Sequence, residues 1–404
     1  MIYRELTQEI FDLVNDFPAI AILGPRQSGK STLAKYIISQ IPDSIYLDLE
    51  DPEDIDKLSN PKLYFTNNSS KLICLDEIQR LPGVFELLRS IIDNNNRNGQ
   101  FLFLGSASPD LLKQTSESLA GRIVFLELSP FTYNEVQKEK DLSSYWFNGG
   151  FPRSLLASST KASRIWRNSF IQTFLERDII QFGFKIPPTV LRRLWQMCAH
   201  SNGQVLNSSK IGDSLGLTHN TVKKYIDILS MTYMLRVLPP FEGNMKKRLI
   251  KSPKLYVRDT GILHSLLQIN DFNQLLGHPT LGSSWETLVI ENIIRALPGF
   301  YPYFYRTSNG AEIDLILKNG TFLFAIECKV SMSPKPTKGF WLSVKNLNPN
   351  RAYIAAPVSE EYQLEENIYV GSFNYIIEDI RGYIKRKEQR QNNNYDFISK
   401  LNKI

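Results

Sequence analysis

The chain has 404 residues, of which 42% are hydrophobic and 22% charged, and its formal net charge is +6. This length predicts two to four domains, and the spacing of three cysteines and four histidines fits neither a disulfide framework nor a zinc site. A secretory leader and a membrane-spanning apolar run are both absent, so we expect a cytoplasmic protein with no membrane partner. The mild positive charge is compatible with nucleic-acid binding but does not demand it.

Residues 20–32 carry the most informative motif. An apolar run leads into G-x-x-x-x-G-K-S and then into a helical pattern, which is the strand, loop and helix of a phosphate-binding loop. Backbone N–H groups and the helix N-terminus favour an anion there. We predict a nucleoside triphosphate with Lys30 at its β- and γ-phosphates and Ser31 on Mg²⁺. The predicted nucleotide-binding residues are Gly24, Gln27, Ser28, Gly29, Lys30, Ser31 and Thr32.

Two acidic residues follow the apolar run at residues 71–75. A parallel strand covered on both faces is continuously apolar, and its carboxyl end faces the nucleotide crevice. Asp76 is therefore predicted to hold the Mg²⁺ shell, and Glu77 to act in catalysis by orienting the attacking water. The alternative is an acidic pair that caps the following helix. A further strand, residues 101–104, leads to Ser106, which is either a γ-phosphate sensor or a turn residue.

Residues 1–135 predict an α/β core with a parallel sheet, the core of a P-loop ATPase. Further strands are expected at residues 44–50 and 123–128, and an amphipathic helix over residues 82–98. Arg122 stands just before the last of these strands. It is either a catalytic arginine that neutralises charge on the γ-phosphate, in its own subunit or in a neighbour's, or an ordinary surface residue.

These motifs together resemble a known family. The spacing of GPRQSGKST, LDEIQ, FLFLGSAS and SLAGR is similar to that of prokaryotic AAA-superfamily ATPases that carry a C-terminal domain of unknown function with a nuclease-like fold. Later segments extend the resemblance over nearly the whole chain: GGFP at 149–152, FLERDI at 174–179 and KLYVRDTG at 254–261. The resemblance implies ATP as the nucleotide. Ser106 departs from the Asn or Thr found at the sensor position of many AAA proteins.

The middle of the chain predicts helices. Residues 136–185 are expected to form a lid or linker, in which Arg177 and Asp178 are either inter-domain or inter-subunit charges or, as is more usual, a solvated helix end. Residues 186–270 predict a winged helix, with helices at 188–200, 208–215 and 218–229. The last helix starts with the polar and basic side chains typical of DNA recognition, although winged helices also pack against proteins. These residues are His219, Asn220, Thr221 and Lys223, and a basic cluster follows at Lys246, Lys247, Arg248 and Lys251.

Residues 271–385 predict an α/β domain built around a hairpin. Asn319-Gly320 is a strong turn signal between two alternating strands, which brings Asp314 and Glu327 close enough to share a metal ion. Lys329 faces the same side and is a candidate catalytic residue. With Glu286 on an upstream helix, this set resembles the PD-(D/E)XK nuclease core. The alternative is an ordinary cross-strand ion pair, so DNA cleavage is left open.

The final residues, 386–404, predict a polar tail. Taken together, the sequence predicts an ATP-hydrolysing AAA-type ATPase that uses ATP and Mg²⁺ and acts on DNA. The alternative hypothesis is an ATP-controlled binding protein or switch without nuclease activity. The pattern permits a homo-oligomer but does not establish one.

Overall fold

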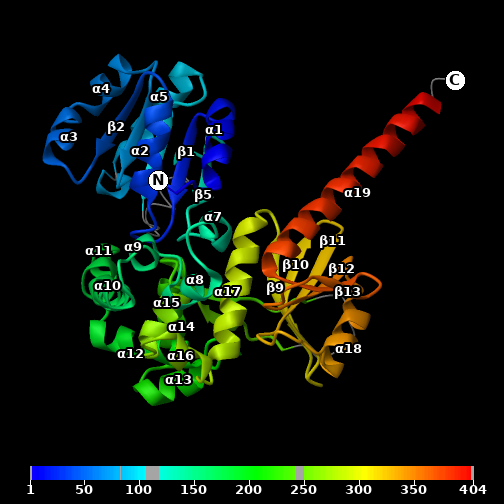
Figure 1. Cartoon of the computed structure of the whole chain (residues 1–404). Helices are drawn as coiled ribbons and strands as arrows, with labels where there is room; N and C mark the ends of the chain where they lie inside the picture. The colour runs from blue at the N-terminus through cyan, green and yellow to red at the C-terminus, as the bar shows by residue number, and fades with distance from the viewer. Residues whose placement is uncertain (1, 82, 106–117, 243–249, 402–404) are drawn as a thin grey trace. The chain divides into compact units, whose positions relative to one another are not determined.

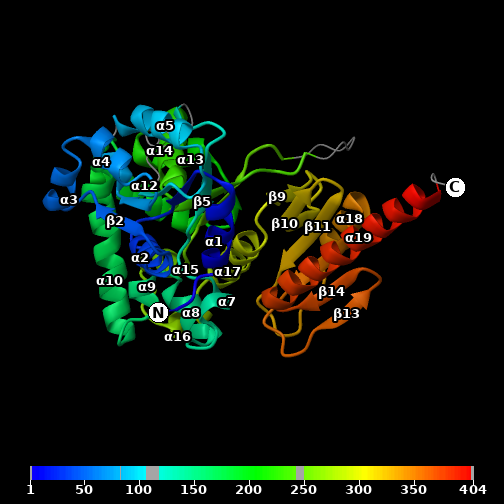
Figure 2. The same ribbon diagram turned by 90° about the horizontal axis from the view of Figure 1, so that it is seen from above.

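The computed structural model describes residues 2–81, 83–105, 118–242 and 250–401, with side chains as far as residue 389. The chain forms two compact units, shown in Figures 1 and 2. The first unit comprises Met1–Ala199, Ser208–Arg236 and Val257–Phe272, and the second comprises His200–Asn207, Val237–Tyr256 and Asn273–Ile404. Ser106 and the cluster of Lys246, Lys247 and Arg248 lie outside the described residues.

A parallel five-stranded sheet organises the first unit. Its order is β2-β3-β4-β1-β5, and every pairing is parallel. The strands are β1 (Ala19–Leu23), β2 (Ser44–Asp48), β3 (Leu72–Asp76), β4 (Phe101–Gly105) and β5 (Ile123–Glu127). β1, β3 and β4 are buried along their whole length, as expected for parallel strands that are covered on both faces.

Helices cover the two faces of this sheet (Figure 1). Ile20 and Ile22 pack with α1 (Leu6–Asp16) and α2 (Lys30–Gln40) on one face. Ala19, Ala21 and Leu23 point to the other face, because successive side chains of a strand alternate. The helical elements on that second face are α3 (Pro52–Lys57), α4 (Pro61–Asn67) and α5 (Val84–Asn95), with the short 3₁₀ turn Ile78–Arg80 after β3.

The rest of the first unit is helical. Its helices are α7 (Tyr133–Val136), α8 (Leu142–Asn148), α9 (Pro152–Leu155), α10 (Thr160–Thr173), α11 (Ile179–Gln181), α12 (Pro188–His200), α13 (Ser208–Leu215), α14 (His219–Met231) and α15 (Thr260–Leu266). A π-helical turn, Phe174–Asp178, joins α10 to α11. The three helices predicted at residues 188–200, 208–215 and 218–229 are therefore present within two residues of their expected ends.

Two sequence motifs without obvious chemistry prove to be packing partners. Asp259 caps α15 by accepting the Ile262 N–H at 2.9 Å, and it accepts the Gly150 N–H at 2.8 Å. A Cβ at Gly261 would lie 2.1 Å from the Asn148 carbonyl oxygen. The GGFP and RDTG segments therefore meet through backbone contacts that only glycine allows.

A six-stranded mixed sheet forms the second unit, in the order β13-β14-β12-β11-β10-β9. The strands are β9 (Tyr301–Arg306), β10 (Glu312–Asn319), β11 (Phe322–Cys328), β12 (Arg351–Ala355), β13 (Tyr362–Glu365) and β14 (Ile368–Gly371). α18 (Lys338–Leu347) packs on one face of the sheet. α17 (Leu281–Ala296) contacts β11, and α19 (Phe373–Leu401) contacts β12 and α17.

The hairpin predicted at Asn319-Gly320 is present, with Leu315 opposite Ile326 and Asn319 opposite Phe322. The pairing of β10 with β9 shifts register between Ile313 and Ile316, and such a bulge commonly redirects a side chain. Asp314 lies inside it. α19 extends beyond the sheet of this unit (Figure 2), so the backbone is helical through most of the predicted tail.

Three smaller strands, β6 (Gln204–Val205), β7 (Leu235–Leu238) and β8 (Lys254–Val257), form a third sheet in the order β6-β8-β7. The short helix α16 spans Phe272–Leu276. Residues 237–256 group with the C-terminal unit, although the sequence placed them with the winged helix. None of the helices in the described ranges has the length and apolar character needed to cross a membrane.

Candidate functional site

The loop between β1 and α2 has the form of a phosphate cradle. Gly29 adopts φ +99° and caps α2 at its N-terminus, a backbone conformation that favours glycine. A Cβ at Gly24 would lie 2.2 Å from the Leu128 carbonyl oxygen. The Oγ of Ser28 is buried and has no hydrogen-bond partner among the described residues. An unpartnered buried hydroxyl at the N-terminus of a helix fits a bound anion.

Lys30 is folded back onto this loop. Its ammonium donates to the carbonyl oxygens of Gly24 at 3.1 Å and Pro25 at 3.0 Å. Gln27 and Thr32 are exposed, and Ser31 is half-buried at the start of α2. The predicted nucleotide-binding residues therefore lie together in the loop between β1 and α2 and in the first turn of α2.

Asp76 and Glu77 follow β3 directly. The Tyr46 hydroxyl donates to Asp76 Oδ2, and the Glu77 N–H donates to Asp76 Oδ1 at 2.9 Å. Glu77 itself adopts φ +57°, a conformation that is uncommon for a residue with a Cβ and costs about 1–3 kcal/mol where the surrounding fold imposes it. Strain of this kind clusters at functional sites, which agrees with a catalytic position.

Burial dominates the electrostatics of these groups. It lowers the pKa of Lys30, while the carboxylates of Glu77 and Asp76 oppose that shift. Burial also raises the pKa of Glu77, and Lys30 opposes this shift in turn. Lys30 follows the carboxyl end of β1 and the two acids lie at the carboxyl end of β3, so all three lie at one edge of the parallel sheet, with β4 between these two strands.

The position predicted for Arg122 is wrong. Its carbonyl accepts the N–H of Ala19, the first residue of β1, at 3.2 Å, and its guanidinium pairs with Asp93 at 2.5 Å. Because β1 and β5 are parallel, Arg122 lies at their amino ends, about 15 Å of strand away from the phosphate-binding loop. It cannot serve the site of its own subunit there, and only its action on a neighbour stays a prediction.

Other arginines, which the sequence did not single out, surround the loop. Arg4 is buried and donates to the Ser28 carbonyl at 3.0 Å, to the Ser129 carbonyl at 2.6 Å and to Glu135 at 3.0 Å. Arg258 pairs with Glu127, the last residue of β5, at 2.5 Å. Nothing in the spacing marks Arg4, because its partners are up to 131 residues away.

Arg26 connects the loop to the helical segment that follows. It pairs at 2.5 Å with Asp178, whose side chain is only 3% exposed. Asp178 is therefore a buried partner of Arg26 and not a solvated residue, whereas the neighbouring Arg177 is exposed. The π-helical turn that ends at Asp178 directs this carboxylate, and turns of this type are frequent at functional sites.

Helices α13 and α14 form a tight helix-turn-helix. The Leu217 N–H donates to the Gly212 carbonyl at 2.9 Å, and Thr218 caps α14 by accepting the Thr221 N–H at 3.2 Å. A Cβ at Gly212 would lie 2.5 Å from the Leu217 carbonyl oxygen, so glycine is required for this approach. The first turn of α14 carries His219, Asn220 and Lys223, all exposed.

The second unit gathers three acidic side chains around a lysine that sequence reasoning missed. Lys254, on β8, lies 3.0 Å from Glu286 Oε1, 2.8 Å from Glu312 Oε1 and 3.0 Å from Asp314 Oδ1. The Tyr256 hydroxyl also donates to Glu286. Glu327 pairs with Lys329 at 2.6 Å. Of the predicted quartet, Glu286 and Asp314 therefore share Lys254, whereas Glu327 and Lys329 pair with each other.

The acids of this cluster have pKa values that are shifted in opposite directions. Burial raises the pKa of Glu286 to about 7 and that of Glu327 to about 8, and the Asp314 charge adds to both shifts. Burial acts on Asp314 in the same direction, but the Lys254 ammonium and the Cys328 N–H outweigh it and lower the pKa of Asp314. The carboxylates around Lys254 raise its pKa, although burial opposes this.

These residues do not fit the metal ion that the nuclease resemblance implies. Within the described ranges, no three His, Cys, Asp or Glu side chains are arranged to hold a metal ion. Two of the expected acids, Glu286 and Asp314, already share the Lys254 ammonium. We therefore derive no metal-dependent step at this cluster.

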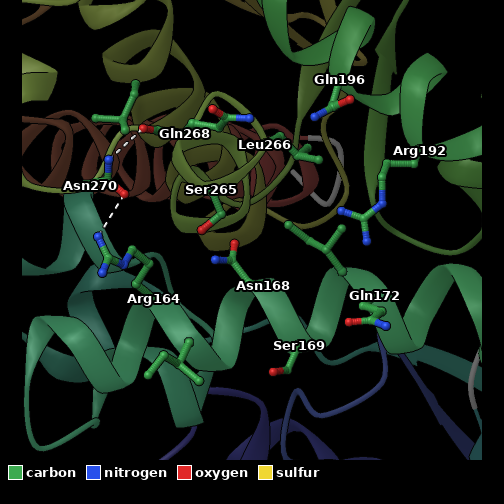
Figure 3. A pocket seen from close by; sticks show the side chains of 13 residues that line it. Arg164, Asn168, Ser169, Gln172, Arg192, Gln196, Ser265, Leu266, Gln268 and Asn270 are labelled. Atoms are coloured by element: carbon green, nitrogen blue, oxygen red, sulfur yellow. Dashed lines mark hydrogen bonds between the residues drawn. The ribbon is translucent and has the colours of Figure 1, made fainter. Parts of the chain in front are cut away.

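A polar cavity of about 640 Å³ lies elsewhere in the first unit, between α10, α12 and α15 (Figure 3). Arg164 and Arg192 line it, together with amide and hydroxyl side chains such as Asn168, Gln196 and Ser265. Arg164 donates to Asn270 at 2.9 Å across the rim. The cavity contains none of the residues of the phosphate-binding loop.

Three family models match successive segments of the chain. The family model described as "AAA domain" matches residues 16–137. Two models described as domains of unknown function, DUF8612 and DUF4143, match residues 139–273 and 281–376. Together with the parallel sheet and the loop geometry, the first match defines the N-terminal part as a P-loop ATPase domain of AAA type, and hence as a nucleotide-binding domain.

The chain belongs to the family of two uncharacterized mycobacterial proteins, Rv2008c of Mycobacterium tuberculosis and Mb2031c of Mycobacterium bovis. Each is 37% identical to it over 351 residues, which cover 87% of this chain and 79% of the relative. Among solved structures, a Thermotoga maritima RuvB Holliday junction branch migration motor matches with 19% identity and a TM-score of 0.29, over 59% of this chain and 90% of that one. AMPPCP-bound DnaA from Aquifex aeolicus matches with 14% identity and a TM-score of 0.31, over 56% and 86%. These two likenesses are too distant to bear on activity or partners.

Proposed function

We propose that this chain hydrolyses ATP at the loop between β1 and α2. The observation that carries the proposal is the meeting of Lys30, Asp76 and Glu77 at the carboxyl edge of one parallel sheet. On nucleotide binding, Lys30 exchanges the carbonyls of Gly24 and Pro25 for the β- and γ-phosphates. Glu77 then orients the attacking water and accepts its proton.

Mg²⁺ fits the same edge through the Ser31 hydroxyl and the Asp76 carboxylate, and when bound it neutralises charge on the phosphates. The Tyr46 hydroxyl and the Glu77 N–H orient Asp76 for this role. Arg26 contributes a further positive charge beside the phosphates. Its pairing with Asp178 couples the nucleotide site to the helical segment, which supports a role for that segment in transmitting the nucleotide state.

Lys30→Ala is the direct test of this proposal. We expect Mg²⁺-dependent phosphate release to fall at least about 100-fold, because removing one preorganised charge from a phosphoryl-transfer site has effects of this size. Lys62→Ala is the matched control, since Lys62 is exposed on α4 in the same unit. Phosphate release that survives in purified Lys30→Ala protein would contradict the proposal.

We also propose that α14 contacts DNA. Its first turn presents exposed His219, Asn220 and Lys223, the side-chain types that reach base edges and phosphates from a recognition helix. ATP hydrolysis would then control how the protein holds DNA. The domain limits at residues 135, 185, 270 and 385 are part of this proposal, as is self-association that places Arg122 beside a neighbour's γ-phosphate.

Lys223→Ala is expected to weaken binding to duplex DNA of any sequence. It should lower the slope of log affinity against log salt by about 1, because one phosphate contact is lost. Fluorescence anisotropy over a salt series measures both quantities. Lys161→Ala, at an exposed lysine of α10, should leave the slope unchanged. An unchanged slope in Lys223→Ala would favour a helix-turn-helix that packs against protein.

The second candidate function is an ATP-controlled switch without nuclease activity. One observation favours it over a nuclease, namely that Lys254 pairs with two of the acids that metal-dependent cleavage would need. In this case the C-terminal unit holds a partner but does not cut it.

A further inference from the structure

A lysine of the same unit, Lys254, neutralises part of the negative charge of the acidic cluster in the second unit. We infer that the Lys254 ammonium is a built-in cation that occupies the place of a divalent metal ion among Glu286, Glu312 and Asp314. The C-terminal unit then keeps the arrangement of a metal-dependent nuclease while working without the metal. This inference goes beyond the proposed ATPase and does not depend on it, because the cluster and the phosphate-binding loop share no residue.

The Lys254 ammonium is surrounded by carboxylate oxygens, as a bound metal ion would be. Three carboxylates from two elements, α17 and β10, each place one oxygen 2.8–3.0 Å from its Nζ. Lys254 is only 2% exposed, so its ammonium depends on these carboxylates and not on bulk water for its charge partners. An ammonium has three N–H donors; Lys254 donates hydrogen bonds to Glu286 and Asp314 and forms an ion pair with Glu312.

The oxygens that remain offer little to a second cation. Asp314 Oδ2 accepts the Cys328 N–H at 3.0 Å, and Glu327 Oε1 is held by Lys329 at 2.6 Å. Glu327 Oε2 is the carboxylate oxygen of this quartet that is buried without a hydrogen-bond partner among the described residues. A divalent ion there would face the Lys329 ammonium at close range, and like charges in a buried site repel strongly.

The bulge in β10 shows how the arrangement is built. The register shift between Ile313 and Ile316 directs Asp314 towards β8, while β6 and β8 pair so that Val205 is opposite Lys254. Lys254 therefore ties β8, β10 and α17 together. A metal ion bound by the same acids would join only α17 and β10, because the contribution of β8 to the cluster is the lysine itself.

The experiment is Mn²⁺ binding by the full-length chain, followed by electron paramagnetic resonance without nucleotide. All proteins carry Lys30→Ala, so that the phosphate-binding loop contributes no metal site. We expect no bound Mn²⁺ in this parent protein. Lys254→Ala should gain one bound Mn²⁺ together with a rise in melting temperature on Mn²⁺ addition, and adding Asp314→Asn to it should abolish both. Lys335→Ala, at an exposed lysine of the same unit, should gain neither.

Mn²⁺ bound by the parent protein and lost on Asp314→Asn would overturn the inference, and would direct attention to Glu327 Oε2 as a ligand. A folded Lys254→Ala protein that gains no Mn²⁺ would also overturn it. If Lys254→Ala does not fold, the comparison of the parent protein with its Asp314→Asn variant decides by itself, because Asp314-dependent binding contradicts the inference and its absence supports it.

Discussion

Glu77→Gln is expected to lower the rate of ATP hydrolysis by about 10²–10⁴-fold while ATP binding persists, the range typical for loss of a general base. Glutamine keeps the size and polarity of the side chain but cannot accept the proton of the attacking water. Lys30, Ser31 and the loop backbone remain to bind the phosphates. Rapid-quench hydrolysis and fluorescent-nucleotide titration measure the rate and the affinity separately.

The pH dependence provides an independent signature of the same residue. Burial raises the pKa of Glu77, so its carboxylate becomes protonated at a higher pH than an ordinary glutamate would. Activity that needs the carboxylate is therefore lost earlier as the pH falls, and Glu77→Gln should remove this acidic limb from the residual rate. Glu86→Gln, at an exposed acid of α5, should retain both the rate and the limb. Retained full activity in Glu77→Gln would assign the base to another group.

Arg4→Met is expected to lower the free energy of unfolding of the first unit by about 3–5 kcal/mol, the usual cost of removing one partner from a buried ion pair. Glu135 would lose its guanidinium partner, and its side chain is only 4% exposed. Methionine retains the apolar volume of the arginine stem, so the loss would report charge and hydrogen bonds more than packing. Urea denaturation measures the change.

The same substitution should also weaken ATP binding, because Arg4 fixes the carbonyl of Ser28 inside the phosphate-binding loop. Arg153→Met replaces an exposed arginine of the same unit and should change neither quantity by more than about 0.5 kcal/mol. If Arg4→Met were as stable as the parent protein, the contacts of Arg4 would contribute no net stability and the link to the loop would have to be abandoned.

Local patterns in the sequence predicted the elements well. The phosphate-binding loop was recognisable because its glycines, its lysine and the following helix are neighbours in the chain. The hairpin at Asn319-Gly320 was recognisable because the turn signal and the alternating strands are also contiguous. The capped helix α14 was predicted to start at Thr218, and the structure confirms the cap.

Errors arose where a position depended on the path of the whole chain. Arg122 looked catalytic because it stands next to a core strand, but only the parallel pairing of β1 and β5 decides which end of the sheet it occupies. Asp178 looked more like a solvated helix end than a contact residue, because its partner Arg26 is 152 residues away.

The sequence by itself determined the nucleotide-binding class of this protein and the acids of its C-terminal unit, since each rests on residue types at short, fixed spacings. Only the tertiary structure decided what those acids contact. Lys254 is 32 residues from Glu286 and 60 from Asp314. It belongs to residues 186–270, which the sequence assigned to a winged helix and not to the C-terminal domain. A buried cation is recognised by what surrounds it in space, and that surrounding exists only once β8, α17 and β10 have come together.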